Sequence, residues 1–460
     1  MRNPSPALAG TWQSDGFPAI HQSATPLRIS FPRKMILWMV GAYLILNVGF
    51  EMVRIPPVGP GIPIGELVLI LCILAMSTRT LLPMMAKEVW LLPILVWWGL
   101  SLSRSVMDFS SGGIWAFRDA SQAIESLYLI VGFWLVSSET NLQYFFRWLR
   151  RMLVIAAGYG LLFPLSGKLQ AISPKLSGFG TGATPIFFAM QNAAVMLIWA
   201  AAWLLIDRPP NARPTITRDL FAGILLAVGV AFGQSRSNYL QVLVLGAVLF
   251  AVKRRAATKW AVTLLLGAVL IGAISLSGFE LRGRENQKIS LDFIAQHFES
   301  ISGSSSGSEN IQGATAGISL RIGWWRHILD QLESSPAKMA FGLGYGIPLT
   351  DFQGSTAVTR EPHNSYISVI GRLGVSGMLV WVLMQAALYT SWLRSFRLCK
   401  RMHWTSDQIN LLILLIFCLL TLVESAGEAA MEVPFYAIPY YFFFGVILRY
   451  GRHLRQAAAS

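Results

Sequence analysis

The sequence predicts an all-α, polytopic membrane protein with about twelve transmembrane helices. Of the 460 residues, 54% are hydrophobic and only 13% are charged, whereas soluble domains carry about 25% charged residues. The mean hydropathy is +0.53, and apolar segments follow one another along most of the chain. A water-soluble fold could not bury this much apolar surface, so we expect the lipid bilayer to surround most of the chain.

The predicted spans are the apolar segments found with a hydropathy window of about 19 residues. Several are shorter than the ~20 residues that a straight span needs. The spans cover residues 35–53, 63–78, 88–103, 121–137, 150–166, 184–206, 218–233, 237–252, 259–277, 364–391, 407–424 and 433–449.

The basic residues predict the orientation of these spans. Clusters of Lys and Arg occur in alternate loops, for example at 147–151, 253–259 and 394–401, and the intervening short loops hold one or two. By the positive-inside rule the basic loops are cytoplasmic, as are both termini. The net charge of +14 is therefore attributed to topology and lipid contacts rather than to nucleic acid. We expect a disordered cytoplasmic tail at 1–34, helices 1–9 over 35–277, a periplasmic loop at 278–363, helices 10–12 over 364–449, and a cytoplasmic tail at 450–460.

The absence of several motifs narrows the functional classes to which the protein can belong. The chain has no Walker A motif, which argues against an ATP-driven pump, and no Asp-x-Asp pair of the kind that holds a metal and a nucleotide sugar. The three cysteines show no metal-ligand spacing and no disulfide framework. We expect no metal and no cofactor.

A first candidate site is the short turn Gly233–Asn238, which joins two predicted spans. Arg236 lies in this turn, at the outer mouth of the helix bundle. Charged groups at membrane depth are costly and are functional candidates. The alternative is an interfacial arginine whose side chain reaches lipid phosphate.

A second candidate lies in the long loop, where residues 319–334 have a helical pattern. Trp325, Ile328, Leu329 and Leu332 recur at helical spacing, and Arg321 precedes them on the same face. Arg326 and Asp330 lie on the opposite, polar face. A guanidinium on an apolar face needs an anion or a carbonyl as partner, either a substrate or a loop carboxylate in a structural ion pair.

The third candidate is His363-Asn364, where the loop re-enters the membrane. Imidazole titrates near neutrality and can accept a proton from a hydroxyl, although a histidine at a helix start is often a satisfied polar group. Gly374 and Gly377 in the span that follows favour close helix packing. The acidic residues Glu424, Glu428 and Glu432 are interpreted as a solvated rim.

The last 230 or so residues resemble the O-antigen ligase and polysaccharide polymerase superfamily. The resemblance rests on an ordered set of elements and not on any single one. These elements are Ser235-Arg236 after a tight turn, a long loop with Arg321 to Trp325 and then Pro336, Gly342 and Gly344, and His363-Asn364 before Gly374 and Gly377. Many members of the family have an acidic residue shortly before the first glycine of the last motif, where this chain has Arg372-Leu373.

The resemblance implies a metal-independent, inverting glycosyltransferase in the bacterial inner membrane. The donor would be a glycan on undecaprenyl diphosphate, and the acceptor a sugar hydroxyl on lipid A–core or on another glycan, with other assembly proteins as partners. The family's catalytic residues correspond to Arg236, Arg321 and His363. We expect neighbouring polar and aromatic residues to contact substrate, namely Asn364, Arg360, Trp325 and Arg326.

Three functions remain open at this point. The chain can polymerise lipid-linked repeat units into O-antigen or exopolysaccharide, or it can ligate finished glycan to lipid A–core. The third alternative is a transporter or flippase for the same lipids. Transport predicts ionisable residues along a path through the bilayer. The predicted candidates gather instead at the outer edge, which favours an enzyme.

Overall fold

A computed structural model describes residues 29–55, 62–76, 88, 90–175, 186–207, 216–233, 235–277, 309–351 and 360–459. The described part is helical almost throughout, and its β structure is a single antiparallel pair of two-residue strands. The all-α class predicted from the sequence is confirmed. The predicted tail at 1–34 and the loop segment 278–308 lie mostly outside the described residues.

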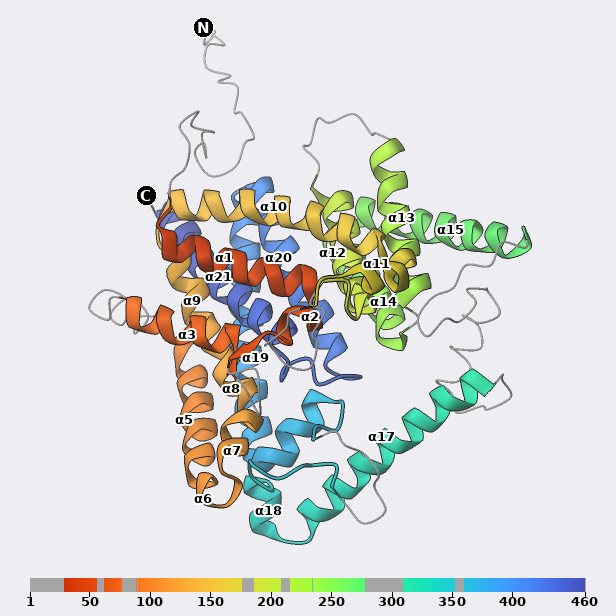
Figure 1. Cartoon of the computed structure of the whole chain (residues 1–460). Helices are drawn as coiled ribbons and strands as arrows, with labels where there is room; N and C mark the ends of the chain where they lie inside the picture. The colour runs from red at the N-terminus through yellow and green to blue at the C-terminus, as the bar shows by residue number, and fades with distance from the viewer. Residues whose placement is uncertain are drawn as a thin grey trace, which may run out of the picture.

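The elements follow one another along the chain with few long connections (Figure 1). They are α1 Phe31–Leu46, α2 Val48–Glu51, β1 Arg54–Ile55, β2 Ile62–Pro63, α3 Ile64–Ala75, α5 Leu91–Met107, α6 Phe109–Gly112, α7 Ile114–Asp119, α8 Ser121–Ser126, α9 Tyr128–Leu135, α10 Glu139–Leu161, η1 Phe163–Leu165, α11 Ser166–Ile172, η2 Met190–Ala193, α12 Ala194–Ile206, α13 Ile216–Gly233, α14 Arg236–Val252, α15 Arg254–Leu276, α17 Glu309–Glu333, α18 Pro336–Phe341, α19 Ser365–Arg401, α20 Thr405–Glu424 and α21 Pro434–Ala459.

Each predicted span falls on one to three consecutive helices. Among the described residues, three helices are long and apolar enough to cross a bilayer: α19, α20 and the first 20 residues of α15. A fourth span is formed if the bent pair α10 and η1–α11 crosses as one. Other apolar helices, such as α3, α5, α12 and α14, have between 10 and 17 residues. The number of spans therefore stays a prediction.

The core of the bundle forms around α21. Nearly every residue of α21 from Pro434 to Tyr450 is buried, and α9, α19 and α20 pack against it. The backbones of α9 and α21 come into contact, because a Cβ at Gly132 would lie 2.0 Å from Phe442 O and a Cβ at Gly445 would lie 2.1 Å from Leu129 O. Glycine permits this approach, which is a common way for membrane helices to associate.

The tight turn between α13 and α14 is confirmed. Helix α13 ends at Gly233 and α14 begins at Arg236. A Cβ on Gly233 would lie 2.2 Å from Nδ2 of Asn238, so a larger residue would require the Asn238 side chain to move. The side chains of Ser235 and Ser237 lie 2.7 Å apart and share a hydrogen bond. Ser235 and Arg236 are thereby held at one end of α14.

The predicted loop helix is present but longer, and its buried face differs from the prediction. Helix α17 has 25 residues instead of the sixteen or so predicted. Its buried side chains are Trp324, Ile328 and Leu332. Leu329 is exposed and Trp325 only partly buried, so assigning both to the buried face was wrong. The buried face is shifted around the helix because α17 packs on α18 and α19 along one narrow line. Figure 1 shows α17 extending away from the rest of the bundle.

The glycine-rich return after α18 is docked against α19 and α7. Gly342, Gly344 and Gly346 all have positive φ, at 78°, 91° and 92°, a region that favours glycine. The backbone N–H groups of Leu343 and Gly344 donate to the carbonyls of Gly371 and Arg372 at 2.7 and 3.0 Å. Helix α19 is kinked where this turn meets it, since Gly374 has φ 67° and lies against Ala340. The packing role predicted for Gly374 is confirmed.

A buried aspartate fixes this return. Asp119, at the end of α7, forms ion pairs with Arg360 at 2.8 Å and with Arg372 at 3.0 Å, and its side chain is fully buried. It also accepts the backbone N–H of Gly346 at 2.9 Å. The segment that leads from the turn into α19 is therefore held at both ends by one carboxylate, which positions His363.

Candidate active site

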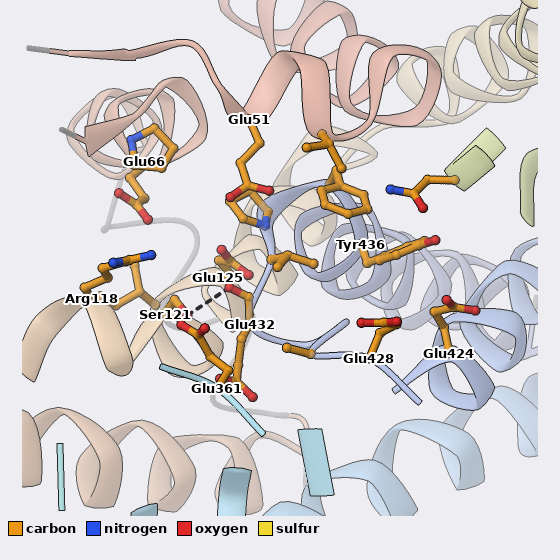
Figure 2. A pocket seen from close by; sticks show the side chains of 18 of the residues that line it. Glu51, Glu66, Arg118, Ser121, Glu125, Glu361, Glu424, Glu428, Glu432 and Tyr436 are labelled. Carbon is orange, nitrogen blue, oxygen red and sulfur yellow. Dashed lines mark hydrogen bonds between the residues drawn. The ribbon is translucent and has the colours of Figure 1, made fainter. Parts of the chain in front are cut away.

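A cavity of about 1090 Å³ lies where α2, α3 and α8 face the loop between α20 and α21. Its lining also includes the α13–α14 turn, Arg321 of α17 and the residues just before α19. Figure 2 shows that side chains from the first third of the chain and from its last forty residues point into the same space. Two of the predicted catalytic residues, Arg321 and His363, line this cavity.

Glu428 joins the two predicted catalytic residues. Its Oε2 lies 2.8 Å from Nδ1 of His363, and its Oε1 accepts a hydrogen bond from Nη2 of Arg321 at 3.1 Å. Arg321 also donates through Nη1 to the carbonyl of Gly427 at 2.7 Å. All three side chains are about one third exposed, so they are accessible from the cavity.

Contacts made by neighbouring residues fix the backbone conformation around His363. His363 has φ 50°, an uncommon left-handed value for a non-glycine residue and one that is frequent at functional sites. The next residue, Asn364, caps α19 by accepting the backbone N–H groups of Tyr366 and Ile367 at 3.0 and 3.1 Å. Its Nδ2 donates to Ala426 O at 3.0 Å, and the His363 ring stacks on Trp324 with centroids 6.0 Å apart. The imidazole is thus oriented from three sides.

Glu428 is ionised in this setting. Burial alone would raise its pKa, but the hydrogen bond to His363 and the positive charge of Arg321 outweigh burial and lower the pKa below its ordinary value. A carboxylate at Nδ1 stabilises the tautomer that carries the proton there, which leaves Nε2 of His363 as a proton acceptor. The interpretation of Glu424, Glu428 and Glu432 as a solvated rim was wrong, since all three line the cavity and Glu424 is only 7% exposed.

Arg236 lies beside the cavity at the start of α14. Its neighbours Ser235 and Asn238 line the cavity, and Arg236 is near enough to Arg321 for their positive charges to interact. Arg321 and His363 line the cavity, and Arg236 lies beside it. The guanidinium group of Arg321 favours an anionic ligand group at this end.

The four residues predicted to contact substrate have other placements. Asn364 caps α19, and Trp325 donates its indole N–H to Pro362 O at 2.9 Å, which holds the segment before His363. Arg360 pairs with Asp119 and lies over the Trp115 ring at 4.4 Å. Arg326 is exposed on the far side of α17. None of these four side chains lines the described cavity, so their contact with substrate remains a prediction.

The departure from the family pattern at Arg372 has a structural explanation. Arg372 is buried, with 4% of its side chain exposed, and pairs with Asp119. It also donates to the carbonyls of Gly344 and Ile347. Arg372 therefore helps to hold the glycine-rich return in place. In the described structure the carboxylate beside the candidate histidine comes instead from Glu428, on the loop between α20 and α21.

The sequence reasoning also passed over three glutamates inside predicted spans. Glu51, Glu66 and Glu125 belong to α2, α3 and α8 and line the same cavity. A signal for them existed, because an ionisable residue within a transmembrane segment is a functional candidate by default. Each of the three lies within four residues of the outer end of its predicted span, in agreement with the expectation that the candidates gather at the outer edge.

Glu432 predicts a pH dependence of stability. Burial, assisted by the negative charge of Glu361, raises the pKa of Glu432 from 4.5 to about 8. The folded protein then holds this proton more tightly than the unfolded chain does. The stabilisation is complete below pH 4.5 and is lost as the pH rises towards 8. We expect the melting temperature in detergent to fall from pH 5 to pH 8, and Glu432→Gln to flatten this slope. Glu333→Gln, at an exposed position, is the control, and an unchanged slope in Glu432→Gln would contradict the assignment.

The fold and the cavity define an all-α protein with several apolar helices and a site in which Arg321, His363 and Glu428 meet. Residues 221–382 match the family model described as O-antigen ligase, which supports the predicted resemblance to the O-antigen ligase and polysaccharide polymerase superfamily. No curated protein matches the chain. The matched segment contains Arg236, Arg321 and His363 but ends before Glu428. This match and the apolar helices together support a membrane protein of the ligase or polymerase type.

Proposed function

We propose that the protein is a membrane glycosyltransferase of polysaccharide assembly. It transfers a glycan from undecaprenyl diphosphate to a sugar hydroxyl, on the periplasmic face of the bacterial inner membrane and with both termini in the cytoplasm. The observation that carries the proposal is the contact of Arg321 and His363 through Glu428 in one large cavity. The O-antigen ligase match over residues 221–382 supports the same class of reaction.

In the proposed step, the acceptor hydroxyl oxygen attacks the anomeric carbon of the donor sugar. The bond from that carbon to the diphosphate oxygen breaks as the new glycosidic bond forms, so the anomeric configuration is inverted. Nε2 of His363 takes the hydroxyl proton, and Glu428 on Nδ1 stabilises the imidazolium that results. The leaving group is undecaprenyl diphosphate, which keeps the electron pair of the broken bond.

The arginines stabilise the leaving group. Negative charge on the bridging oxygen grows as the bond breaks, and guanidinium groups can donate two hydrogen bonds to phosphate oxygens while staying charged at any relevant pH. Arg321, which lines the cavity, and Arg236, which lies beside it, are the cations assigned to the diphosphate in this proposal. Fixed charges aimed at developing charge contribute about 10²–10³-fold per group, and the general base contributes about 10²–10⁴-fold. This mechanism requires no metal.

The direct test is transfer by purified protein in nanodiscs, without ATP, from a synthetic undecaprenyl-diphosphate glycan. Two acceptors are supplied separately: lipid A–core and a second lipid-linked glycan. We expect a new glycosidic bond, detected by mass spectrometry. Product on lipid A–core identifies a ligase, and a doubled lipid-linked glycan identifies a polymerase. Protein that moves the lipid between vesicle leaflets yet forms no bond with either acceptor would refute the enzyme and support a transporter.

A further inference from the structure

The cavity has two ends that differ in their charged residues. The first, described above, holds Arg321 and His363 with Glu424 and Glu428. The second, which we call the acidic end, collects side chains from α2, α3, α7 and α8 together with the segment before α19 and the loop before α21 (Figure 2). Its charged residues are Glu51, Glu66, Glu125, Glu361, Glu432, Arg54 and Arg118. Five carboxyl groups thus face two guanidinium groups.

Glu125 is the unusual member of the acidic end. The residue is fully buried, at 0% exposure, and lines the cavity. Within the part of the chain that the structure describes, neither of its carboxyl oxygens has a hydrogen-bond partner, and Oε1 of Glu432 also lacks one. Figure 2 shows Glu125 among Glu51 and Glu432. An unsatisfied buried acceptor is energetically costly, and three of them in one cavity point to hydrogen-bond donors supplied by a ligand.

The neighbouring cations do not supply those donors. Arg54 pairs with Glu51 at 2.9 Å and also donates to the Glu51 carbonyl. The guanidinium of Arg118 lies over the Trp115 ring at 4.8 Å. Each arginine therefore already has a partner beside the cavity. The carboxyl oxygens of Glu125 are left to accept hydrogen bonds from a ligand in the cavity.

The chemistry of the acidic end narrows the ligand. A diphosphate would meet repulsion from the carboxyl groups, so it belongs at the arginine end. Within the described residues, no three His, Cys, Asp or Glu side chains are placed to hold a metal ion together. A hydroxyl-rich group fits, because each hydroxyl donates to a carboxyl oxygen. Phe117 and Phe435 line the same cavity and offer apolar surface to the C–H face of a sugar ring.

We propose that the acidic end of the cavity is the subsite for an uncharged, hydroxyl-rich sugar, which it selects over sugars that carry a carboxylate. This inference rests on the proposed function and adds to it the class of sugar and its orientation. The diphosphate faces Arg321, and the sugar ring faces Glu125. The sugar is either that of the donor or that of the acceptor, and the two sources are separable by experiment.

The test uses Glu125→Leu in nanodiscs with three probes: undecaprenyl diphosphate alone, the same lipid with a neutral N-acetylhexosamine disaccharide, and the same lipid with a uronic acid in that disaccharide. We expect wild-type protein to bind the neutral glycolipid at least tenfold more tightly than the uronate. Glu125→Leu should bind bare undecaprenyl diphosphate as wild type does and the neutral glycolipid ten- to a hundredfold more weakly. Glu333→Leu, exposed at the end of α17, is the matched control.

The thermal stability of the same variant separates a binding role from a structural one. Replacing an unpaired buried carboxyl with an apolar side chain removes a desolvation penalty. We therefore expect Glu125→Leu to melt at a higher temperature than wild type while it binds sugar less well. A loss of both stability and binding would overturn the inference.

The remaining outcomes distinguish this inference from the proposed function. If the variant binds the neutral glycolipid normally but the KM for acceptor rises tenfold or more, the subsite holds the acceptor sugar. If both stay at wild-type values, or if wild type prefers the uronate, the sugar subsite is refuted while lipid-diphosphate binding stands. If wild type binds none of the lipids but binds the free neutral disaccharide, and Glu125→Leu does not, the proposed donor is wrong and the sugar subsite is supported.

Discussion

Replacing His363 is expected to reduce glycan transfer by about 10²–10⁴-fold, the usual contribution of a general base. The reason is that Nε2 is left to accept the acceptor's proton while Nδ1 is bound to Glu428. We expect His363→Ala to abolish measurable transfer while leaving membrane insertion intact. His363→Asn is the sharper variant, because asparagine tolerates the left-handed backbone at φ 50° but cannot act as a base.

His403 offers a matched control for this experiment. It also has a positive φ, 58°, and is exposed in the turn between α19 and α20, away from the cavity. His403→Asn should therefore retain wild-type transfer. The measurement is the initial rate of product formation in nanodiscs at saturating donor, with fluorescence-detected gel filtration to verify folding. Transfer by His363→Asn within threefold of wild type would rule out the base.

Replacing Arg321 by lysine is the second large expected effect. The side chain at this position donates to Gly427 O through one nitrogen and to Glu428 through another, and in the proposed step it also contacts the diphosphate. Lysine keeps the charge but cannot supply this planar fork. We expect kcat to fall about 10²–10³-fold, the range for loss of one group that stabilises developing charge.

The division between kcat and KM tests this role. Because the leaving group's charge grows in the transition state, the loss should fall mainly on kcat, with a smaller rise in KM for the donor. Arg151→Lys, at an exposed position of α10, should match wild type. A variant whose KM alone rises would show that Arg321 binds the ground state only, and an unaffected variant would remove it from the mechanism.

Much of the fold follows from local features of the sequence. Hydropathy alone located helices at all twelve predicted spans. It could do so because a run of apolar residues about one helix long is enough to predict a helix with buried apolar side chains. The turn at Gly233–Arg236 and the glycines at 342, 344 and 346 were also predictable, since glycine is the residue that tight turns and positive φ require. Where each span begins and ends was less predictable, as α10 shows by starting at Glu139.

The candidate site, like the fold, could be predicted from the sequence only in part. Arg236, Arg321 and His363 are recognisable in order along the chain, and the cavity brings Arg321 and His363 together. Their partner was missed. Glu428 lies 65 residues after His363 and 107 after Arg321, and nothing in its local sequence distinguishes it from a solvated acidic residue. The face of α17 was also misjudged, because Trp324 and Trp325 are adjacent and only packing against α18 and α19 decides which one is buried.

By itself the sequence determined that the chain is an all-α membrane protein, that its long loop carries the candidate Arg321, and that His363 stands where this loop meets a helix. Only the tertiary structure decided which carboxylates those groups meet. Hydropathy and turn propensity act over a few residues, whereas the pairing of His363 with Glu428, of Arg372 with Asp119, and the burial of Glu125 depend on contacts between distant segments. The cavity and its two ends are consequences of that packing.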